Sequence, residues 1–499
     1  MKSLTIVSRK SVLAQLQSFE VAEAIKENFS DIEINFLTKE TTGDIDLTTP
    51  LHKMPEMGVF TSDIRETLLS GKADIAVHSW KDLPVELESG TEIIATIPRA
   101  DLRDVLVFKP TSLNKKNIKI FTSSPRRKEN LNKFLLKALP GEISSIDFED
   151  IRGNILTRLQ KLLDSNLDGL VIAKAALDRL LGADENSFTE LKKFKKNINE
   201  LNWMVVPSSK NPCAPGQGAL AIEVNSKNSK VKKIINKIND LDTFENVNFE
   251  RESLKKYGGG CHQKIGISVE NINLGKVITE KGLTPDGDDI NHRYFLPHKE
   301  NLNTLTSPVS NFYPKTKKNF NLFDREPLKE GVNNLNKIRN SGLYISRAST
   351  ITDDISIDSS NIVWTSGVVN WFKLAKKGVW VNGTSDNLGE KQSLPESINS
   401  KLQWFLVSHS KSRQDGKNLI ATYELKAKSN IEDFSKNSHF FWMSFSSYKL
   451  AVKLYPTIKD AEHSCGLGKT FDELNEINPG KIKPFLNYED WLEKVKEAK

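Results

Sequence analysis

The first 225 residues alternate short apolar runs with amphipathic segments, and this alternation constrains the fold more than any other feature of the sequence. Apolar runs of about four to eight residues are typical of buried strands, and apolar residues at helical spacing are typical of helices that cover a sheet. Strands that alternate with helices favour a parallel, doubly wound sheet. We therefore predict an α/β fold for this part of the chain.

The alternation occurs twice. Strand-like runs are expected at 4–8, 32–37 and 73–79, and again at 105–108, 118–121, 144–148 and 170–173. Ser11 and Ser124 each follow a strand and precede helical spacing, so we expect both to be N-caps. Ligands of open α/β sheets bind beyond the carboxyl ends of the strands, and two such domains side by side form a cleft. We expect the chemistry to lie in that cleft.

A chain of 499 residues is long enough for three or four domains. We predict a first domain from residues 1–98 and 200–224, a second domain from 99–199, a small α+β domain from 225–300, a linker or insertion over 301–340, and a C-terminal α/β domain over 341–499. The proposed linker is rich in Asn, Lys, Ser and Pro and has little periodicity.

Composition narrows the function classes. The formal net charge of +7 suits an anionic ligand but is too diffuse for nucleic acid. No run of about 18 or more apolar residues is present, so we expect no membrane partner. The three cysteines form no CxxC pair, which disfavours a disulfide framework and a metal site. A strand-like run at residues 4–8 leaves no room for a signal peptide, and we expect a cytoplasmic protein.

The segment VHSWKDLP (77–84) places polar side chains where an apolar strand ends. Asp82 is a carboxylate suited to a cationic intermediate or to proton transfer, and Lys81 beside it is suited to an acidic group. A lysine and an aspartate before Pro84 are equally typical of a solvated turn. The segment alone leaves both interpretations open.

Arginines gather near strand ends and helix starts in a chain where lysines outnumber them nearly four to one. The arginines concerned are Arg9, Arg126, Arg127, Arg152, Arg158 and Arg179. Two of them follow Ser124 at an expected helix N-terminus, a position suited to a carboxylate or phosphate. Surface arginines are the plain alternative, but clustering in a lysine-rich chain indicates that bidentate geometry is used.

Two glycine-containing segments stand apart. In APGQGALAIE (214–223), Gln217 lies between glycines that let a ligand approach closely, although a tight crossover between domains explains the pattern equally well. In YGGGCHQKIG (257–266), Cys261 follows three glycines, and an accessible thiol near cations can act as a nucleophile or a covalent tether. Cys213 and Cys465 lack that setting.

Seven motifs, in this order and spacing, resemble the porphobilinogen deaminase (hydroxymethylbilane synthase) family over residues 1–300. They are SRKS (8–11), TTGD (41–44), VHSWKDLP (77–84), SSPRR (123–127), RGNILTR (152–158), APGQGAL (214–220) and GGGC (258–261). The resemblance implies a transferase that joins porphobilinogen units head to tail, releases ammonia each time, and yields a linear tetrapyrrole, hydroxymethylbilane. It also implies one covalent dipyrromethane cofactor per chain.

The resemblance assigns a role to each matching residue. Asp82 is expected to be the catalytic carboxylate that steadies the cationic intermediate, and Cys261 to carry the dipyrromethane through a thioether. The expected cofactor contacts are Lys81, Ser124, Arg126, Arg127 and Asp44. The expected substrate contacts are Arg9, Ser11, Gln17, Arg152, Arg158, Arg179, Phe60 and Gln217.

The architecture that the resemblance implies has two doubly wound domains similar to periplasmic binding proteins, a small α+β domain with the cysteine, and a monomeric state. MPEMGVFTSD (54–63) departs from the family's GGKGLF-type loop, so we expect closure over the site to differ. The catalytic and anchor positions are intact, and we predict an active enzyme.

The C-terminal third is similar to uroporphyrinogen-III synthase, the next enzyme of the same pathway. The similar segments are 364–390, 440–456, 465–474 and 481–495. A second activity that cyclises the bilane to uroporphyrinogen III is implied. A structural appendage is the alternative, because fold resemblance does not secure function and 341–499 is short for that two-domain enzyme.

Two other functions stay open for the whole chain. A solute-binding module would share the cleft and the arginines, but it has no use for an accessible Cys261 opposite Asp82. A pseudoenzyme that binds tetrapyrrole would keep the arginines and release no ammonia, and the altered 54–63 segment is its only support.

Overall fold

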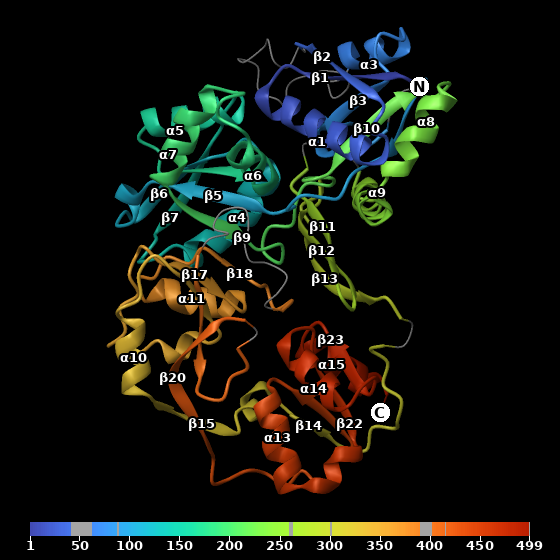
Figure 1. Ribbon diagram of the computed structural model, residues 1–499. Coiled ribbons are helices and arrows are strands. Elements are labelled where there is room, and N and C mark those ends of the chain that lie inside the picture. The colour runs from blue at the N-terminus through green and yellow to red at the C-terminus, as the bar shows by residue number, and fades with distance from the viewer. Residues whose placement is uncertain are drawn as a thin grey trace. The chain divides into compact units, whose positions relative to one another are not determined.

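The computed structural model describes residues 1–40, 62–86, 89–258, 263–299, 302–389, 402–414 and 416–498. These residues form two compact units, one of Met1–Val269 with Thr279–His292 and the other of Glu270–Ile278 with Arg293–Lys499. Each unit combines helices with β-sheets, so the protein is of mixed α/β class (Figure 1). Within the described residues, no helix is both long and apolar enough to cross a membrane.

The first sheet of unit 1 has the strand order β2-β1-β3-β10-β4. Its strands are β1 (Ser3–Arg9), β2 (Glu33–Lys39), β3 (Ile75–Ser79), β4 (Thr91–Ala95) and β10 (Leu220–Asn225). β1 is parallel to β2 and β3, whereas β10 is antiparallel to β3 and β4. The expectation of a wholly parallel sheet is wrong for this strand, because β10 returns from the second sheet without the crossover helix that a parallel neighbour requires.

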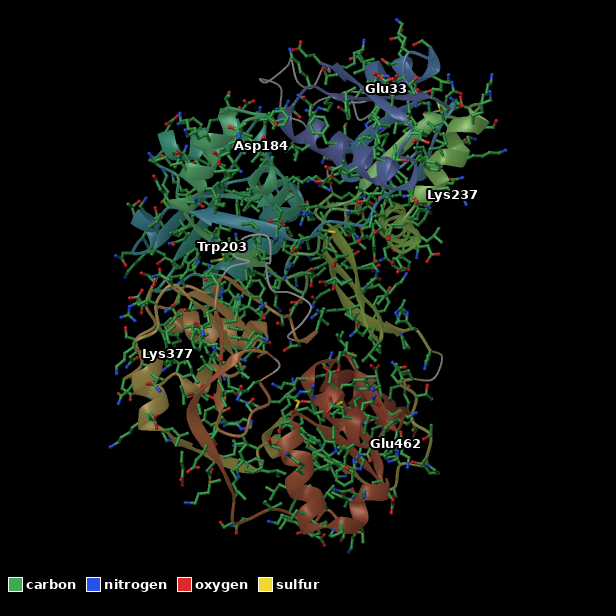
Figure 2. All side chains as sticks on the ribbon, in the orientation of Figure 1. Glu33, Asp184, Trp203, Lys237, Lys377 and Glu462 are labelled. Atoms are coloured by element: carbon green, nitrogen blue, oxygen red, sulfur yellow. The ribbon has the colours of Figure 1, made fainter. Side chains whose placement is uncertain are left out.

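The second sheet has the strand order β7-β6-β8-β5-β9. Its strands are β5 (Asp104–Phe108), β6 (Asn117–Phe121), β7 (Ser145–Glu149), β8 (Gly169–Ala173) and β9 (Asn202–Val206). It is also mixed, since β6 is parallel to β7 and β8 while β5 is antiparallel to β8 and β9. β9 carries Trp203 (Figure 2). Its pairing with β5 means that the chain returns to the first sheet with β10, later than the predicted position 200.

Helices connect these strands, and two of their starts match the sequence expectation. The helices are α1 (Val12–Asn28), α3 (Ser62–Leu69), α4 (Pro125–Ala138), α5 (Ile155–Asp164), α6 (Lys174–Gly182) and α7 (Glu190–Asn199). The Ser11 hydroxyl accepts from the backbone N–H of Ala14, and the Ser124 hydroxyl accepts from that of Arg127. Both predicted N-caps are confirmed, and both lie at the carboxyl side of a strand.

Residues 225–300 contain two helices and a three-stranded sheet. The elements are α8 (Ser229–Ile235), α9 (Leu241–Lys255), β11 (Gly266–Ile272), β12 (Gly275–Leu283) and β13 (Asp289–Pro297). Val231 and Ile235 of α8 are buried in the core of the first sheet. Val247 of α9 packs with Trp80 and Leu83. Both helices of the predicted third domain therefore pack against elements of the first one.

Residues 301–340 are not a plain linker. They include β14 (Phe312–Tyr313), β15 (Phe323–Pro327) and α10 (Lys329–Leu335). β14 pairs with β21 and β15 pairs with β20, so each strand forms the edge of a C-terminal sheet. β14 has two residues and β15 is short and largely charged, so neither shows the apolar periodicity from which a strand is predicted.

The C-terminal region has two sheets. The six-stranded sheet β15-β20-β19-β16-β17-β18 contains β16 (Gly342–Ile345), β17 (Ile362–Thr365), β18 (Gly383–Thr384), β19 (Trp404–His409) and β20 (Asn418–Ala427). The four-stranded sheet β14-β21-β22-β23 contains β21 (His439–Trp442), β22 (Glu462–Gly466) and β23 (Ile482–Phe485). The helices are α11 (Val368–Lys376), α13 (Phe445–Leu454), α14 (Lys469–Ile477) and α15 (Tyr488–Glu497).

Candidate active site

Asp82 lies in a short 3-10 turn (Trp80–Asp82) that directly follows β3. Trp80 is 1% exposed and packs with Leu83 and Val247. The Asp82 side chain is exposed, and it accepts no hydrogen bond from the part of the chain that the structure describes. The buried tryptophan anchors the turn, while the carboxylate next to it stays accessible.

Arg251 of α9 fixes the same turn through its backbone. Its guanidinium donates to the carbonyl oxygens of Trp80 (3.4 Å) and Leu83 (3.3 Å) and to that of Pro84. These carbonyls flank Asp82 on both sides, and the Arg251 side chain is buried among them. Arg251 is therefore a positioning residue for Asp82.

Charges from several segments of unit 1 gather around Arg158, and Asp82 is one of them. The pKa of Arg158 is lowered to about 10, first by burial and then by the charges of Arg127 and Arg152. Arg9 lowers the pKa of Arg158 as well, whereas the Asp82 carboxylate raises it. Charges influence one another strongly only at short range in a protein. The structure therefore brings four of the predicted arginines together with Asp82, and Arg158 stays cationic at neutral pH.

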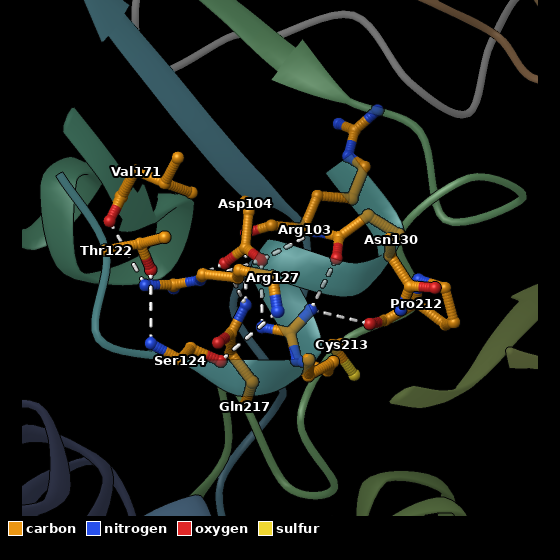
Figure 3. A network of polar contacts seen from close by, with 12 residues as sticks. Arg103, Asp104, Thr122, Ser124, Arg127, Asn130, Val171, Pro212, Cys213 and Gln217 are labelled. Atoms are coloured by element: carbon orange, nitrogen blue, oxygen red, sulfur yellow. Dashed lines mark hydrogen bonds and ion pairs between the residues drawn. The ribbon is translucent and has the colours of Figure 1, made fainter. Parts of the chain in front are cut away.

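A buried network built on Asp104 holds Arg126 and Arg127, and Figure 3 shows Asp104 and Arg127 within it. One Asp104 oxygen accepts from Arg126 Nη2 at 2.9 Å, and both oxygens accept from Arg127, at 3.1 Å from Nε and 2.6 Å from Nη2. Arg126 Nη1 also donates to Asn211 Oδ1 and the Pro212 carbonyl. Burial by itself raises the pKa of Asp104, but the two guanidinium charges outweigh it and hold that pKa far below its usual range.

Lys81 joins this network to the Asp82 turn. Its Nζ donates to Gln217 Oε1 at 3.2 Å, and Gln217 Nε2 donates in turn to Asp104 Oδ1 at 2.9 Å and to the Leu102 carbonyl. Burial is the main cause that lowers the pKa of Lys81, and nearby Arg127 adds to it. Gln217 thus bridges Lys81 and Asp104 inside the protein.

The small polar residues predicted for the site have partners within the fold. Ser11 and Ser124 cap α1 and α4 through their hydroxyls. Gln17 is 5% exposed, and its Nε2 donates to Ser79 Oγ at 2.8 Å. Since Ser79 ends β3, Gln17 ties α1 to the strand that leads into Asp82.

Arg179 on α6 contacts the first sheet's helix α1. Its Nε lies 2.9 and 3.0 Å from the two carboxylate oxygens of Glu20, and its Nη2 donates to the Gly218 carbonyl at 3.4 Å. Arg158 in α5 donates from Nε to the Gly153 carbonyl at 2.7 Å. These two of the predicted substrate arginines thus differ, because among the described residues Arg179 forms an ion pair with a carboxylate and Arg158 does not.

Asp44, Phe60 and Cys261 lie outside the described residues, as does the altered 54–61 part of the sequence. The other two thiols are described. Cys213 is 1% exposed and donates to the Ile267 carbonyl at 3.2 Å, and Cys465 is fully buried. Burial raises the pKa of both thiols far above the usual range, so neither is a reactive thiolate.

Asp104 and Arg251 were missed by sequence reasoning. Asp104 opens a buried apolar strand, and an ionisable group at that position is a signal for a buried ion pair. Arg251 lies in a helix of mixed polarity, and its partners are backbone carbonyls about 170 residues away, which no local pattern reveals.

A family model described as "Porphobilinogen deaminase, dipyromethane cofactor binding domain" matches residues 4–233. The porphobilinogen deaminase of Caldicellulosiruptor saccharolyticus is 43% identical over 270 residues, which are 54% of this chain and 84% of that protein. The chain belongs to the porphobilinogen deaminase family. The deaminases of Natranaerobius thermophilus and Chlorobium phaeobacteroides are 35% and 37% identical, over 62% and 55% of this chain and 93% and 81% of their own.

Family membership confirms the resemblance over the N-terminal part and makes the chain a transferase of porphyrin and tetrapyrrole biosynthesis with a dipyrromethane cofactor. The match with the family model ends at residue 233. The similarity of the C-terminal third to uroporphyrinogen-III synthase therefore stays a prediction.

Solved structures give only distant similarity. A structure from work on glutathione import through GshT of Streptococcus mutans has a TM-score of 0.25 at 13% identity, over 52% of this chain and 97% of that one. The substrate-binding protein AbpA of Streptococcus pneumoniae has a TM-score of 0.24 at 12% identity, over 52% of this chain and 90% of that one. Scores of this size do not define a shared fold.

Proposed function

We propose that the chain condenses four porphobilinogen units head to tail into hydroxymethylbilane, releasing ammonia at each step, on a dipyrromethane attached to Cys261. The observation that carries this proposal is the exposed Asp82 carboxylate. Arg251 holds its turn, and the charge of Asp82 acts on Arg158 together with the charges of Arg9 and Arg152. We place this activity in the cytoplasm and expect a monomer.

The charge of the site fits both the cofactor and the substrate. Each pyrrole unit carries two carboxylates, so a dipyrromethane and the growing chain are polyanions that guanidinium groups bind bidentately. When bound, the dipyrromethane supplies the α-carbon to which the first substrate is joined. We assign its carboxylates to Lys81, Ser124, Arg126 and Arg127, and a further cofactor contact to Asp44. We assign substrate carboxylates to Arg9, Ser11, Gln17, Arg152, Arg158, Arg179 and Gln217, and a further substrate contact to Phe60.

The assigned residues differ in how many of their hydrogen-bond donors are left for a ligand. Most N–H groups of Arg127 already donate to Asp104 and the Val171 carbonyl, so its main contribution is a fixed charge. Gln217 is likewise engaged by Lys81 and Asp104. Arg158 has one N–H bond to a backbone carbonyl and no carboxylate ion pair within the described residues, which suits it best to an incoming carboxylate.

Asp82 is suited to the step in which ammonia leaves. Loss of ammonia converts the aminomethyl group of porphobilinogen to a methylene cation, and a fixed carboxylate nearby stabilises that charge more than it stabilises the neutral substrate. Among the described residues, Arg251 holds the turn through its backbone and none donates a hydrogen bond to the Asp82 oxygens, so we propose that these oxygens accept from the pyrrole N–H groups.

Cys261 is the favoured attachment site because the other two thiols are buried. Cys213 and Cys465 are buried, and their raised pKa values keep them protonated. Gln263 Nε2 donates to the Tyr257 carbonyl at 2.7 Å, so the described residues on the two sides of Cys261 are in contact.

Intact mass and peptide mapping of the purified protein test the proposal. We expect an excess of two linked pyrroles on the Cys261 peptide, its absence in Cys261→Ser, and its retention in Cys213→Ser. Porphobilinogen should then be consumed with release of one ammonia per unit. An unmodified protein that binds porphobilinogen without releasing ammonia would instead support a pseudoenzyme or a binding module.

A second candidate function is cyclisation of the bilane by the C-terminal region, and one observation favours it. Arg347 follows β16 and His409 ends β19, so both lie at the carboxyl ends of adjacent parallel strands. The pKa of His409 is lowered to about 4, first by burial and then by the charges of Lys469, Arg347, Lys449 and Arg325. No carboxylate in the described residues forms an ion pair with three of these cations, Arg325, Arg347 and Lys449.

Such a cation cluster suits a polycarboxylate. Replacing one of its arginines therefore tests whether the C-terminal region is a cyclase or a structural appendage. With purified hydroxymethylbilane supplied, we expect the type III ring isomer from the full chain and spontaneous type I isomer from Arg347→Gln. Arg339→Gln is the matched control, because Arg339 is half-exposed and pairs with Asp358. Type I product from the unaltered chain would leave the C-terminal region as an appendage.

A further inference from the structure

The ion pair between Arg179 and Glu20 joins the two sheets of unit 1. Arg179 lies on α6, which follows β8 of the second sheet, and Glu20 lies on α1, whose apolar face packs on the first sheet. Next to it, the ring of Phe19 on α1 lies 6.4 Å from the ring of Phe188, which precedes α7. Contacts from two consecutive residues of α1 therefore reach the second domain.

The two partners differ sharply in exposure. The Arg179 side chain is 7% exposed, whereas that of Glu20 is 36% exposed. Removing the carboxylate partner of a buried guanidinium is destabilising, because it leaves a buried charge uncompensated. A half-exposed carboxylate, in contrast, returns to water at little cost. If a ligand carboxylate displaced Glu20, the charge of Arg179 would therefore stay compensated.

We infer that Glu20 is a built-in surrogate for a substrate carboxylate. It occupies Arg179 while the site is empty, and a carboxylate of the incoming or growing pyrrole chain displaces it. The displacement separates α1 from α6 at this point, so binding of the chain loosens the contact between the two domains. This inference rests on the proposed deaminase activity, and it makes Glu20 a positioning residue that sets substrate affinity.

Steady-state turnover of porphobilinogen tests the role of Glu20. In Glu20→Gln, Arg179 no longer has a competing charge, so we expect KM to fall about fivefold, the equivalent of one partly exposed ion pair, without a rise in kcat. Glu20→Asp keeps the charge on a shorter stem, and we expect its KM to lie between the two. Glu23→Gln, an exposed position on the same helix, should match the unaltered protein.

The Arg179→Gln background distinguishes displacement from a general effect. In that background KM is high, and the added Glu20→Gln should leave it unchanged. A KM that stays the same or rises in Glu20→Gln overturns the inference, because Glu20 would then be irrelevant or would orient Arg179 for substrate. If the unaltered protein consumes no porphobilinogen, the proposed function fails first and the inference fails with it.

Discussion

Replacement of Asp104 by asparagine tests the buried network beneath the candidate site. The side chain is 0% exposed and accepts hydrogen bonds from Arg126, Arg127, Asn211 and Gln217. Asparagine keeps the shape and removes the carboxylate that these four residues share. Two guanidinium groups, 4% and 9% exposed, would be left without the charge that compensates them.

The expected loss follows from this geometry. Removal of one partner from a buried pair costs about 3–5 kcal/mol, and here one carboxylate serves two arginines, so we expect the upper half of that range. The assay is the free energy of unfolding in urea. The depressed pKa of Asp104 adds a pH signature: its contribution is fully present above the unfolded pKa of about 4 and is lost as the pH falls below it. Asp104→Asn should lack that part of the acid sensitivity.

Asp147→Asn is the matched control, because Asp147 is an exposed residue of β7 in the same sheet. We expect its effect to stay within about 0.5 kcal/mol. If Asp104→Asn costs no more than this control, the two arginines do not depend on Asp104, and the reasoning about the network is refuted.

Three further predictions address the site and the C-terminal region. Asp82→Asn should keep the attached cofactor mass and lower kcat on the order of 10²–10³-fold, and a variant with unchanged kcat would contradict the role of the carboxylate. Arg251→Gln releases the turn around Asp82, so kcat should fall on the order of 10²-fold while KM changes little, whereas Lys255→Gln in the last turn of α9 should change neither. Between pH 6.5 and about 4, His409 is protonated in the unfolded chain and neutral in the folded one, so lowering the pH should reduce the free energy of unfolding. His409→Gln should flatten the dependence of that free energy on pH. An unaltered dependence would show that His409 titrates normally.

The fold was predictable where an element depends on residues close to it in the sequence. The apolar runs became strands, and the serines at positions 11 and 124 became caps, because both depend on neighbours within a few residues. Strand direction was not predictable for β10, since it depends on where the chain returns from. The same applies to β14 and β15, whose strand state comes from partners about 100 residues or more along the chain.

The site was predictable in residue type and not in pairing. Clustered arginines in a lysine-rich chain indicated an anionic ligand, and in the structure the charges of Asp82, Arg9, Arg127 and Arg152 all act on Arg158. The sequence could not indicate that Arg127 is largely used by Asp104, which is separated from it by 23 residues, or that Arg179 faces Glu20, which is separated by 159.

The carboxylates near the arginines therefore say more about function than the arginines do. Asp104 is buried with its partners and cannot leave, so Arg126 and Arg127 form a permanent positive platform. Glu20 is half-exposed, so its hold on Arg179 can be exchanged for that of another anion. Asp82 is exposed and, among the described residues, is held through its backbone by Arg251, which would leave its charge available to the cation of the proposed reaction. The three carboxylates thus serve three purposes, and the extent to which each carboxylate is buried decides its purpose.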